Sequence, residues 1–206
     1  MNNSFLSLPD DRRTSIINAA LGVFSKYGYK KSPMNEIAKE AGISKSLLFY
    51  YFKNKKELYL YLLKYCAEIK SQRIKEQCCY GGSGFFEMFS HSMITMTNML
   101  RSYPECVMFE LKAYYDNEPE IQAEVLDFIT SYSDFAYQTA PISIDSDQFI
   151  KGIDLELMYR NIYLACEGYL FEKIRKGSLN ADEMEHDYLK MIEHWKQLYL
   201  RKGISL

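Results

Sequence analysis

Apolar residues recur along most of the chain at the three- and four-residue spacing of amphipathic helices. No stretch sustains the alternation of a half-buried β-strand. The pattern therefore predicts an all-α protein of about nine helices, separated by glycine, proline and helix-capping residues. The expected helices span about residues 9–28, 33–41, 45–52, 55–78, 84–101, 103–116, 118–139, 152–176 and 181–202.

Two short helices around a glycine turn are predicted between residues 32 and 52. Ser32 is expected to be the N-cap of the first helix, with Pro33 at the first helical position. Gly42 suits a residue that leaves a helix with positive φ, and Ser44 is expected to cap the second helix. This order is the layout of a helix-turn-helix motif that binds DNA.

The second helix of this motif has large apolar side chains on both of its faces. Leu48, Tyr51 and Phe52 share one side and are expected to be buried. The opposite side holds Lys45, Ser46, Leu47, Phe49 and Tyr50. A DNA major groove could cover that side, because lysine and serine can hydrogen-bond base edges and apolar groups can meet thymine methyls. The residues better suited to phosphate contacts are Ser44, Tyr50, Lys55 and Lys56.

These residues resemble the DNA-binding domain of tetracycline-repressor (TetR) family regulators. The family pattern is a helix, then Thr-x-x-x-Ile-Ala-x-x-Ala-Gly-Val-Ser, then Tyr-x-Tyr-Phe-x-x-Lys, and the resemblance covers about residues 10–60. By resemblance, the positions that usually touch DNA are Ser32, Ser44, Lys45, Ser46, Tyr50 and Lys55. Leu47, Phe49 and Tyr50 stand where the family often has Thr, Tyr and His, and Phe49 has no hydroxyl to offer a phosphate.

Charge divides unevenly along the chain. Residues 1–56 contain ten Lys or Arg and four Asp or Glu, which is a net charge of +6. The remaining residues contain fifteen and twenty-three, which is −8. Basic charge confined to the helix-turn-helix segment is typical of a DNA-binding domain, and an acidic body discourages DNA from lying elsewhere. We therefore expect a DNA-binding domain at 1–54 and a helical effector-binding and dimerisation domain at 55–206.

The helices expected between residues 84 and 139 are rich in Met, Phe and Tyr. Such side chains form adaptable apolar cavities, although each of them is also compatible with an ordinary core. The family resemblance implies a ligand cavity in this body. The candidate ligand contacts are Met88, His91, Met96, Phe109, Glu110, Tyr132 and Asn161.

The last two expected helices carry an apolar, tyrosine-rich stripe that is similar to the four-helix dimer interface of TetR-like proteins. Gly168 lies inside a helix, where glycine costs up to about 1 kcal/mol, so a second helix crossing closely would explain it. The alternative is that the stripe closes the core of one chain. The candidate interface residues are Tyr159, Tyr163, Cys166, Gly168, Trp195 and Tyr199.

The sequence offers little for catalysis, cofactor binding or membrane insertion. It has no phosphate-binding glycine loop, no His-Glu-x-x-His and no nucleophile elbow, and its three histidines are dispersed, so neither an enzyme nor a metal or cofactor site is expected. No apolar run reaches eighteen residues and the N-terminal segment does not resemble a signal peptide, which favours the cytoplasm.

Five cysteines, an odd number, favour reduced thiols. The adjacent Cys78 and Cys79 could sense oxidants or a soft metal, but they have no Cys-x-x-Cys spacing or nearby histidine. Two thiols at the end of a helix are the favoured interpretation.

Together these features favour a dimeric transcriptional regulator, expected to be a repressor, that binds a palindromic operator. A small apolar or amphipathic effector in the body would release it through the helix at 55–78, which begins in the DNA-binding domain and ends in the body. The alternative is a DNA-organising or protein-recruiting adaptor that needs no effector. A cavity would favour the regulator and a fully packed body the adaptor.

The assignment of the groove-facing side can be tested at Lys45. Lys45→Ala is expected to weaken operator binding about 5- to 150-fold, since a good base contact is worth about 1–3 kcal/mol. Self-association should not change. Mobility-shift titration and sedimentation measure the two properties, and unchanged operator affinity would show that the assignment is wrong.

Overall fold

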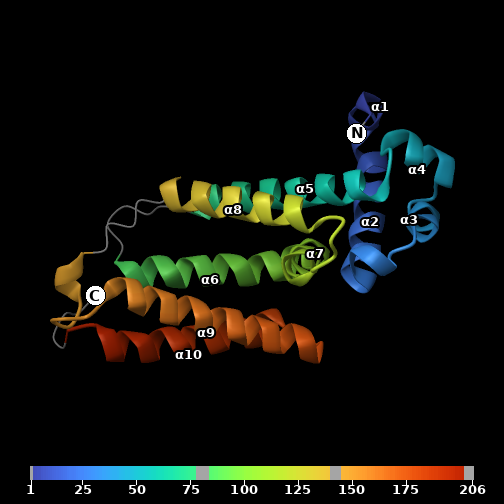
Figure 1. The fold of residues 1–206 in the computed structure, drawn as a ribbon. Coiled ribbons are helices and arrows are strands. Elements are labelled where there is room, and N and C mark those ends of the chain that lie inside the picture. Colours follow the sequence, from blue (N-terminus) through green and yellow to red (C-terminus); the bar gives the residue numbers. More distant parts are fainter. Residues whose placement is uncertain (1, 78–83, 140–144, 202–206) are drawn as a thin grey trace. The chain divides into compact units, whose positions relative to one another are not determined.

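The computed structural model describes residues 2–77, 84–139 and 145–201, with the side chains of 74–77 and 132–139 left out. This part of the chain contains ten α-helices, one short 3₁₀-helix and no β-strand, so the all-α fold is confirmed (Figure 1). The helices are α1 (Asn3–Leu6), α2 (Asp10–Lys31), α3 (Met34–Glu40), α4 (Lys45–Tyr51), α5 (Lys55–Gln77), α6 (Phe85–Ser102), α7 (Pro104–Tyr115), α8 (Gln122–Thr139), α9 (Leu155–Lys176) and α10 (Ala181–Tyr199), with the 3₁₀-helix η1 at Ser146–Gln148.

The nine helices expected from the sequence correspond to α2–α10. The largest shift is at the start of α8, which begins at Gln122 instead of residue 118. Two elements were not expected, α1 and η1, because four- and three-residue helices are too short for an apolar repeat to reveal them.

The chain packs as two compact units, Met1–Lys75 with Ser102–Ala140, and Glu76–Arg101 with Pro141–Leu206. The first unit contains α1–α4, most of α5, α7 and α8, and the second contains α6, η1, α9 and α10. The domain boundary expected between residues 54 and 55 was based on charge and on the helix-turn-helix pattern, not on packing. It stays a prediction.

Three aromatic rings join the first unit together. Phe24 of α2, Tyr59 of α5 and Phe109 of α7 are completely buried. The Tyr59 ring lies 5.0 Å from that of Phe24 and 4.7 Å from that of Phe109, both edge-to-face. Such pairs add about 0.5–1.5 kcal/mol each to the free energy of burial. The cluster therefore holds α7 directly against α2, which belongs to the predicted DNA-binding domain, and against α5, which follows that domain in the sequence.

Gly28 kinks α2 instead of ending it. Its φ is 72°, a left-handed conformation that favours glycine, and the helix continues to Lys31 after the kink. The interruption leaves the Tyr29 N–H free to donate to Asp116 Oδ2 at 3.2 Å. The Tyr29 hydroxyl donates to Glu120 Oε1 at 2.5 Å. The end of α2 is thus bonded to the connection between α7 and α8.

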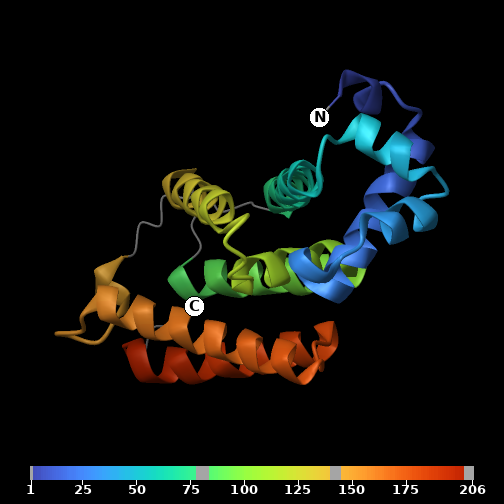
Figure 2. The ribbon, with the colours of Figure 1, turned by 45° about the vertical axis from the view of Figure 1, so that its right-hand side comes forward.

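In the second unit, α10 lies alongside α9 (Figure 2) and also contacts α6. Phe89 of α6 lies edge-to-face on Trp195 at 6.1 Å. On the other side the Tyr169 hydroxyl of α9 donates to Asp187 Oδ2 at 2.8 Å. The buried side of α10 consists of Met184, Tyr188, Ile192 and Trp195, of which Trp195 makes the contact with α6.

Across the described ranges, every helix is too short or too polar to cross a membrane.

The aromatic cluster contains one buried polar atom, the hydroxyl oxygen of Tyr59, and its effect on stability can be tested. The Tyr59 hydroxyl is buried without a hydrogen-bond partner among the described residues, and burial raises the pKa of Tyr59. A buried polar group without a partner costs about 1–3 kcal/mol, so Tyr59→Phe should stabilise the protein. We expect the Tm in thermal unfolding to rise by about 2–4 °C for each kcal/mol recovered.

Tyr29→Phe is the matched control, because its hydroxyl donates to Glu120 and its loss should lower Tm. A lower Tm for both variants would contradict the account of Tyr59.

Candidate DNA-binding surface

The turn between α3 and α4 has the geometry of a helix-turn-helix. Gly42 leaves α3 with φ 63°, and the Ile43 N–H donates to the Ala38 carbonyl at 2.9 Å, which satisfies a carbonyl at the end of the helix. Arg12 of α2 donates to the Gly42 carbonyl at 3.2 Å. Ile43 packs against the core. The turn is therefore held by its own backbone and by α2.

Ser32 has a different role from the one expected. The N-cap position of α3 is taken by Pro33, and Ser32 is the C-cap of α2. Its side chain is buried, and its hydroxyl donates to the carbonyls of Gly28 at 2.6 Å and Val23 at 3.2 Å. The N-cap prediction was therefore wrong. In this conformation the hydroxyl is not presented to DNA.

The recognition helix α4 begins as the sequence indicates, because Ser44 Oγ accepts from the Leu47 N–H at 3.1 Å. Its inner side is confirmed, since Leu48, Tyr51 and Phe52 are all buried. We define the recognition face as its outer residues that are exposed: Lys45, Ser46, Phe49 and Tyr50. Leu47 is only half exposed and packs partly against the core.

Within the recognition face, positive charge and aromatic surface lie together. Lys45 Nζ lies 5.8 Å from the centre of the Phe49 ring, one helical turn further along, a cation–π distance. Of the two aromatic side chains on this face, Tyr50 is 56% exposed and Phe49 36%. The face can therefore offer a cation, hydroxyls and an apolar ring to a groove, and the assignment of these residues to DNA stays a prediction.

The two lysines at the start of α5 are bonded within the protein. Lys55 Nζ donates to the Lys30 carbonyl at 3.0 Å and lies 4.8 Å above the Tyr29 ring. Burial lowers the pKa of Lys55. Lys56 Nζ forms an ion pair with Glu124 Oε1 of α8 at 2.5 Å, and this contact lowers the pKa of Glu124. A phosphate would have to compete with these partners.

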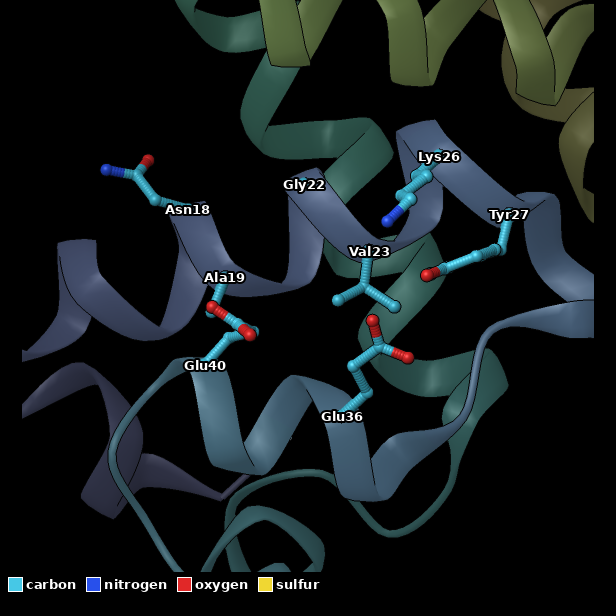
Figure 3. Close-up of a pocket in the computed structure, with 8 residues that line it drawn as sticks. All are labelled: Asn18, Ala19, Gly22, Val23, Lys26, Tyr27, Glu36 and Glu40. Atoms are coloured by element: carbon cyan, nitrogen blue, oxygen red, sulfur yellow. The ribbon is translucent and has the colours of Figure 1, made fainter.

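A surface cleft of about 310 Å³ lies between α2 and α3 (Figure 3). It is lined by Asn18, Ala19, Gly22, Val23, Lys26, Tyr27, Glu36 and Glu40. Lys26 Nζ lies 4.8 Å above the Tyr27 ring, and both glutamates lie on the α3 side. None of the residues expected to bind a ligand lines this cleft.

The candidate ligand contacts are distributed over both packing units. Phe109 and Glu110 belong to the first unit, where Phe109 is part of the aromatic cluster. Burial raises the pKa of Glu110, although Lys70 Nζ lies 3.9 Å away and acts against the rise. In the second unit His91 and Asn161 are exposed, and the remaining members, Met88 and Met96, are half-buried. The side chain of Tyr132 lies outside the described residues, as do Cys78 and Cys79.

The candidate dimer residues lie mainly on α9. Tyr159 and Tyr163 are 40% and 44% exposed, and an added Cβ at Gly168 would meet nothing within 4 Å. Cys166 and Trp195 are buried within the second unit, and burial raises the pKa of Cys166 to about 12. Tyr199 is half-buried. Further exposed apolar residues on these two helices are Leu157, Leu164, Phe171, Leu189 and Leu198.

The sequence did not reveal every residue that shapes the recognition helix. Asn2 and Phe5 contact its C-terminal end, and Ser4 hydrogen-bonds Tyr50. The available signal was weak, because a capping asparagine before one Phe-Leu pair predicts at most a single helical turn. Tyr29 and Glu120 were also missed, since their contact joins positions 91 residues apart.

The geometry and the charge therefore define a helix-turn-helix DNA-binding protein with an additional helical body. The sequence model described as "Bacterial regulatory proteins, tetR family" matches residues 16–62, which include α3, the turn and α4. Residues 16–62 thus match the DNA-binding region of the TetR family of transcriptional regulators, so the resemblance seen in this part of the sequence is confirmed.

Two relatives differ in how much of the chain they match. The transcriptional regulator RutR from Escherichia coli is 38% identical over 58 residues, which is 28% of this chain and 27% of RutR. The chain thus matches about a quarter of that protein's length. IcaR from Staphylococcus epidermidis, the negative regulator of the icaADBC biofilm operon, is 26% identical over 154 residues, or 70% of this chain and 80% of IcaR.

Solved structures extend the similarity of the fold to the whole chain. A TetR-family regulator from Chloroflexus aurantiacus has a TM-score of 0.74 and 22% identity, covering 98% of this chain and 99% of that one. FadR from Bacillus subtilis, solved in complex with stearoyl-CoA, has a TM-score of 0.65 and 16% identity, covering 87% and 96%. At these identities the likeness establishes the fold alone.

The ion pair between Lys56 and Glu124 generates a prediction. Glu124→Gln should leave Lys56 available to a phosphate, raise affinity for all DNA sequences modestly and steepen the salt dependence by about 0.9 per lysine that gains a phosphate. Fluorescence anisotropy at several salt concentrations measures both effects.

Asp127→Asn makes the same change of charge at another exposed position of α8 and is the control. Equal effects of the two variants would mean that overall charge, and not the ion pair, sets the affinity.

Proposed function

We propose that this protein is a transcriptional repressor that binds a palindromic operator as a dimer and is released by a small apolar or amphipathic effector. The observation that carries the proposal is the recognition face, which a helix-turn-helix presents at one end of a unit that also contains α7 and α8. The recognition face and the helices that contact the end of α2 therefore belong to the same packing unit.

Recognition of DNA is assigned to two kinds of contact. Lys45 and Ser46 are suited to base edges, and Phe49 to a thymine methyl. Ser44 and Tyr50 are suited to phosphates, and Lys55 and Lys56 can join them once their internal partners are displaced. The basic charge of residues 1–56 supports this division of roles.

Dimerisation is assigned to the exposed stripe on α9. Leu157, Leu164, Gly168 and Phe171 follow one another at spacings of seven, four and three residues, so they lie on one side of the helix. Three of them are large apolar side chains that are at least half exposed. A partner helix would cover this stripe, and a two-fold dimer would place two recognition helices about 34–36 Å apart, one turn of DNA.

Release by an effector is assigned to movement of α7 and α8. The carboxylates of Asp116 and Glu120 hold Tyr29 at the end of α2, and Lys112 of α7 donates to the Lys26 carbonyl at 2.7 Å. A ligand that displaces α7 or α8 would therefore displace α2 and the helix-turn-helix packed on it. A coupling of about 1–3 kcal/mol, or 5–150-fold in affinity, is enough for such a switch.

Two similar proteins support repression as the mode of regulation and an amphipathic molecule as the effector. IcaR is a negative regulator, which favours repression, and the FadR complex contains stearoyl-CoA, an amphipathic ligand. The methionine- and aromatic-rich sequence of residues 84–139 suits a ligand of that kind. The site of action would be the cytoplasm, where the operator is.

The proposal is tested by measuring operator affinity with and without an effector. An operator selected from random DNA by the purified dimer would be titrated with stearoyl-CoA, with a hydrophobic cation and with neither. We expect at least one ligand that binds the free protein to weaken operator binding 5–150-fold. Glu120→Gln, which weakens the link to Tyr29, should reduce that factor without changing ligand affinity in the absence of DNA.

Ligands that bind tightly but leave operator affinity unchanged would overturn the effector mechanism. That result would favour an adaptor without an effector on the same fold.

A further inference from the structure

The C-terminal end of the recognition helix is completed by a segment that lies outside the family match. α4 has only seven residues, and an isolated helix of this length is unstable in water. Its last carbonyls have no partner within the helix. The Asn2 N–H donates to the Tyr51 carbonyl at 2.9 Å, and the Asn2 side-chain amide donates to the Tyr50 carbonyl at 3.4 Å. Asn2 therefore supplies donors where α4 ends.

A buried aromatic side chain anchors this segment. Phe5 is completely buried, and its ring lies 4.7 Å from that of Phe52 and 5.4 Å from that of Tyr61. Both contacts are edge-to-face, which is a favoured geometry. Arg13 of α2 also donates to the carbonyls of the turn that follows, at Leu6 and Leu8. The position of α1 against α4 is thus determined by packing and by hydrogen bonds.

Ser4, which lies between Asn2 and Phe5 in the sequence, contacts the recognition face. Its Oγ lies 3.1 Å from the hydroxyl oxygen of Tyr50, which is the more exposed of the two aromatic residues on that face. A tyrosine hydroxyl can accept a hydrogen bond while it donates another. If Ser4 donates, the Tyr50 proton is left pointing away from Ser4 and available to a phosphate oxygen.

We propose that Asn2, Ser4 and Phe5, the N-terminal clamp, are positioning residues for DNA recognition: Phe5 anchors the segment, Asn2 caps the recognition helix, and Ser4 orients the Tyr50 hydroxyl toward a phosphate. The proposal rests on the proposed function, because it requires α4 to contact DNA. Ser4 acts through Tyr50 and need not touch DNA itself.

A double-mutant cycle tests this arrangement in the full-length dimer. Ser4→Ala and Tyr50→Phe are each expected to weaken binding to operator and non-operator DNA about three- to tenfold, the effect of one hydrogen bond. The double variant should bind no more weakly than Tyr50→Phe alone, because Ser4 has no route to DNA once the hydroxyl is gone. Tm should change little in either single variant, since both side chains are at least partly exposed.

Two further variants serve as controls. Ser4→Thr keeps the hydroxyl and should restore DNA affinity. Asn3→Ala changes the exposed residue next to Ser4 and should leave affinity at the wild-type value.

The outcomes separate this proposal from the proposed function. Additive losses in the double variant, or a loss of Tm in Ser4→Ala that matches its loss of affinity, would overturn the positioning role. If Tyr50→Phe binds normally while Lys45→Ala loses the operator, the clamp proposal fails and the proposed function stands. If neither variant affects DNA binding, the proposed function fails as well.

Discussion

Burial of three aromatic rings joins the DNA-binding helices to the rest of the first packing unit. Phe24, Tyr59 and Phe109 come from α2, α5 and α7, and the centres of their rings lie between 4.7 and 6.1 Å apart. Because protein interiors are close-packed, none of these helices can shift without disturbing the other two. Any signal that reaches α7 therefore reaches the helix that carries the helix-turn-helix. This packing is the physical basis on which the proposed switch depends.

Charge acts on the same helices in a second way. Three lysines near the helix-turn-helix, Lys30, Lys55 and Lys56, are bonded to or attracted by groups within the protein. The acids just before α8 and in its first turn contribute to this. A DNA phosphate would be a stronger competitor at low salt than at high salt, since exposed charges are screened. In the proposed function, DNA phosphates would have to replace these contacts with the acidic residues.

Much of the fold was predictable because local rules determine it. Ser44 caps α4, Gly42 ends α3 with positive φ, and the buried side of α4 follows from its apolar spacing. The kink at Gly28 was not predictable, because the same residue can end a helix or bend it. Because the helix continues past Gly28, Ser32 is the C-cap of α2 and not the N-cap of α3, and its hydroxyl donates to the carbonyls of Val23 and Gly28.

The sequence by itself determined that the chain is helical, that residues 32–52 form a helix-turn-helix and that basic charge accompanies it. Helicity and the helix-turn-helix depend on residues that are close in sequence, and the basic charge is the net charge of a segment. Only the tertiary structure decided that Phe109 joins the core, that Lys56 pairs with Glu124 and that Ser4 reaches Tyr50. These contacts join residues 46 or more positions apart, and their formation depends on how whole helices pack, which no local pattern records.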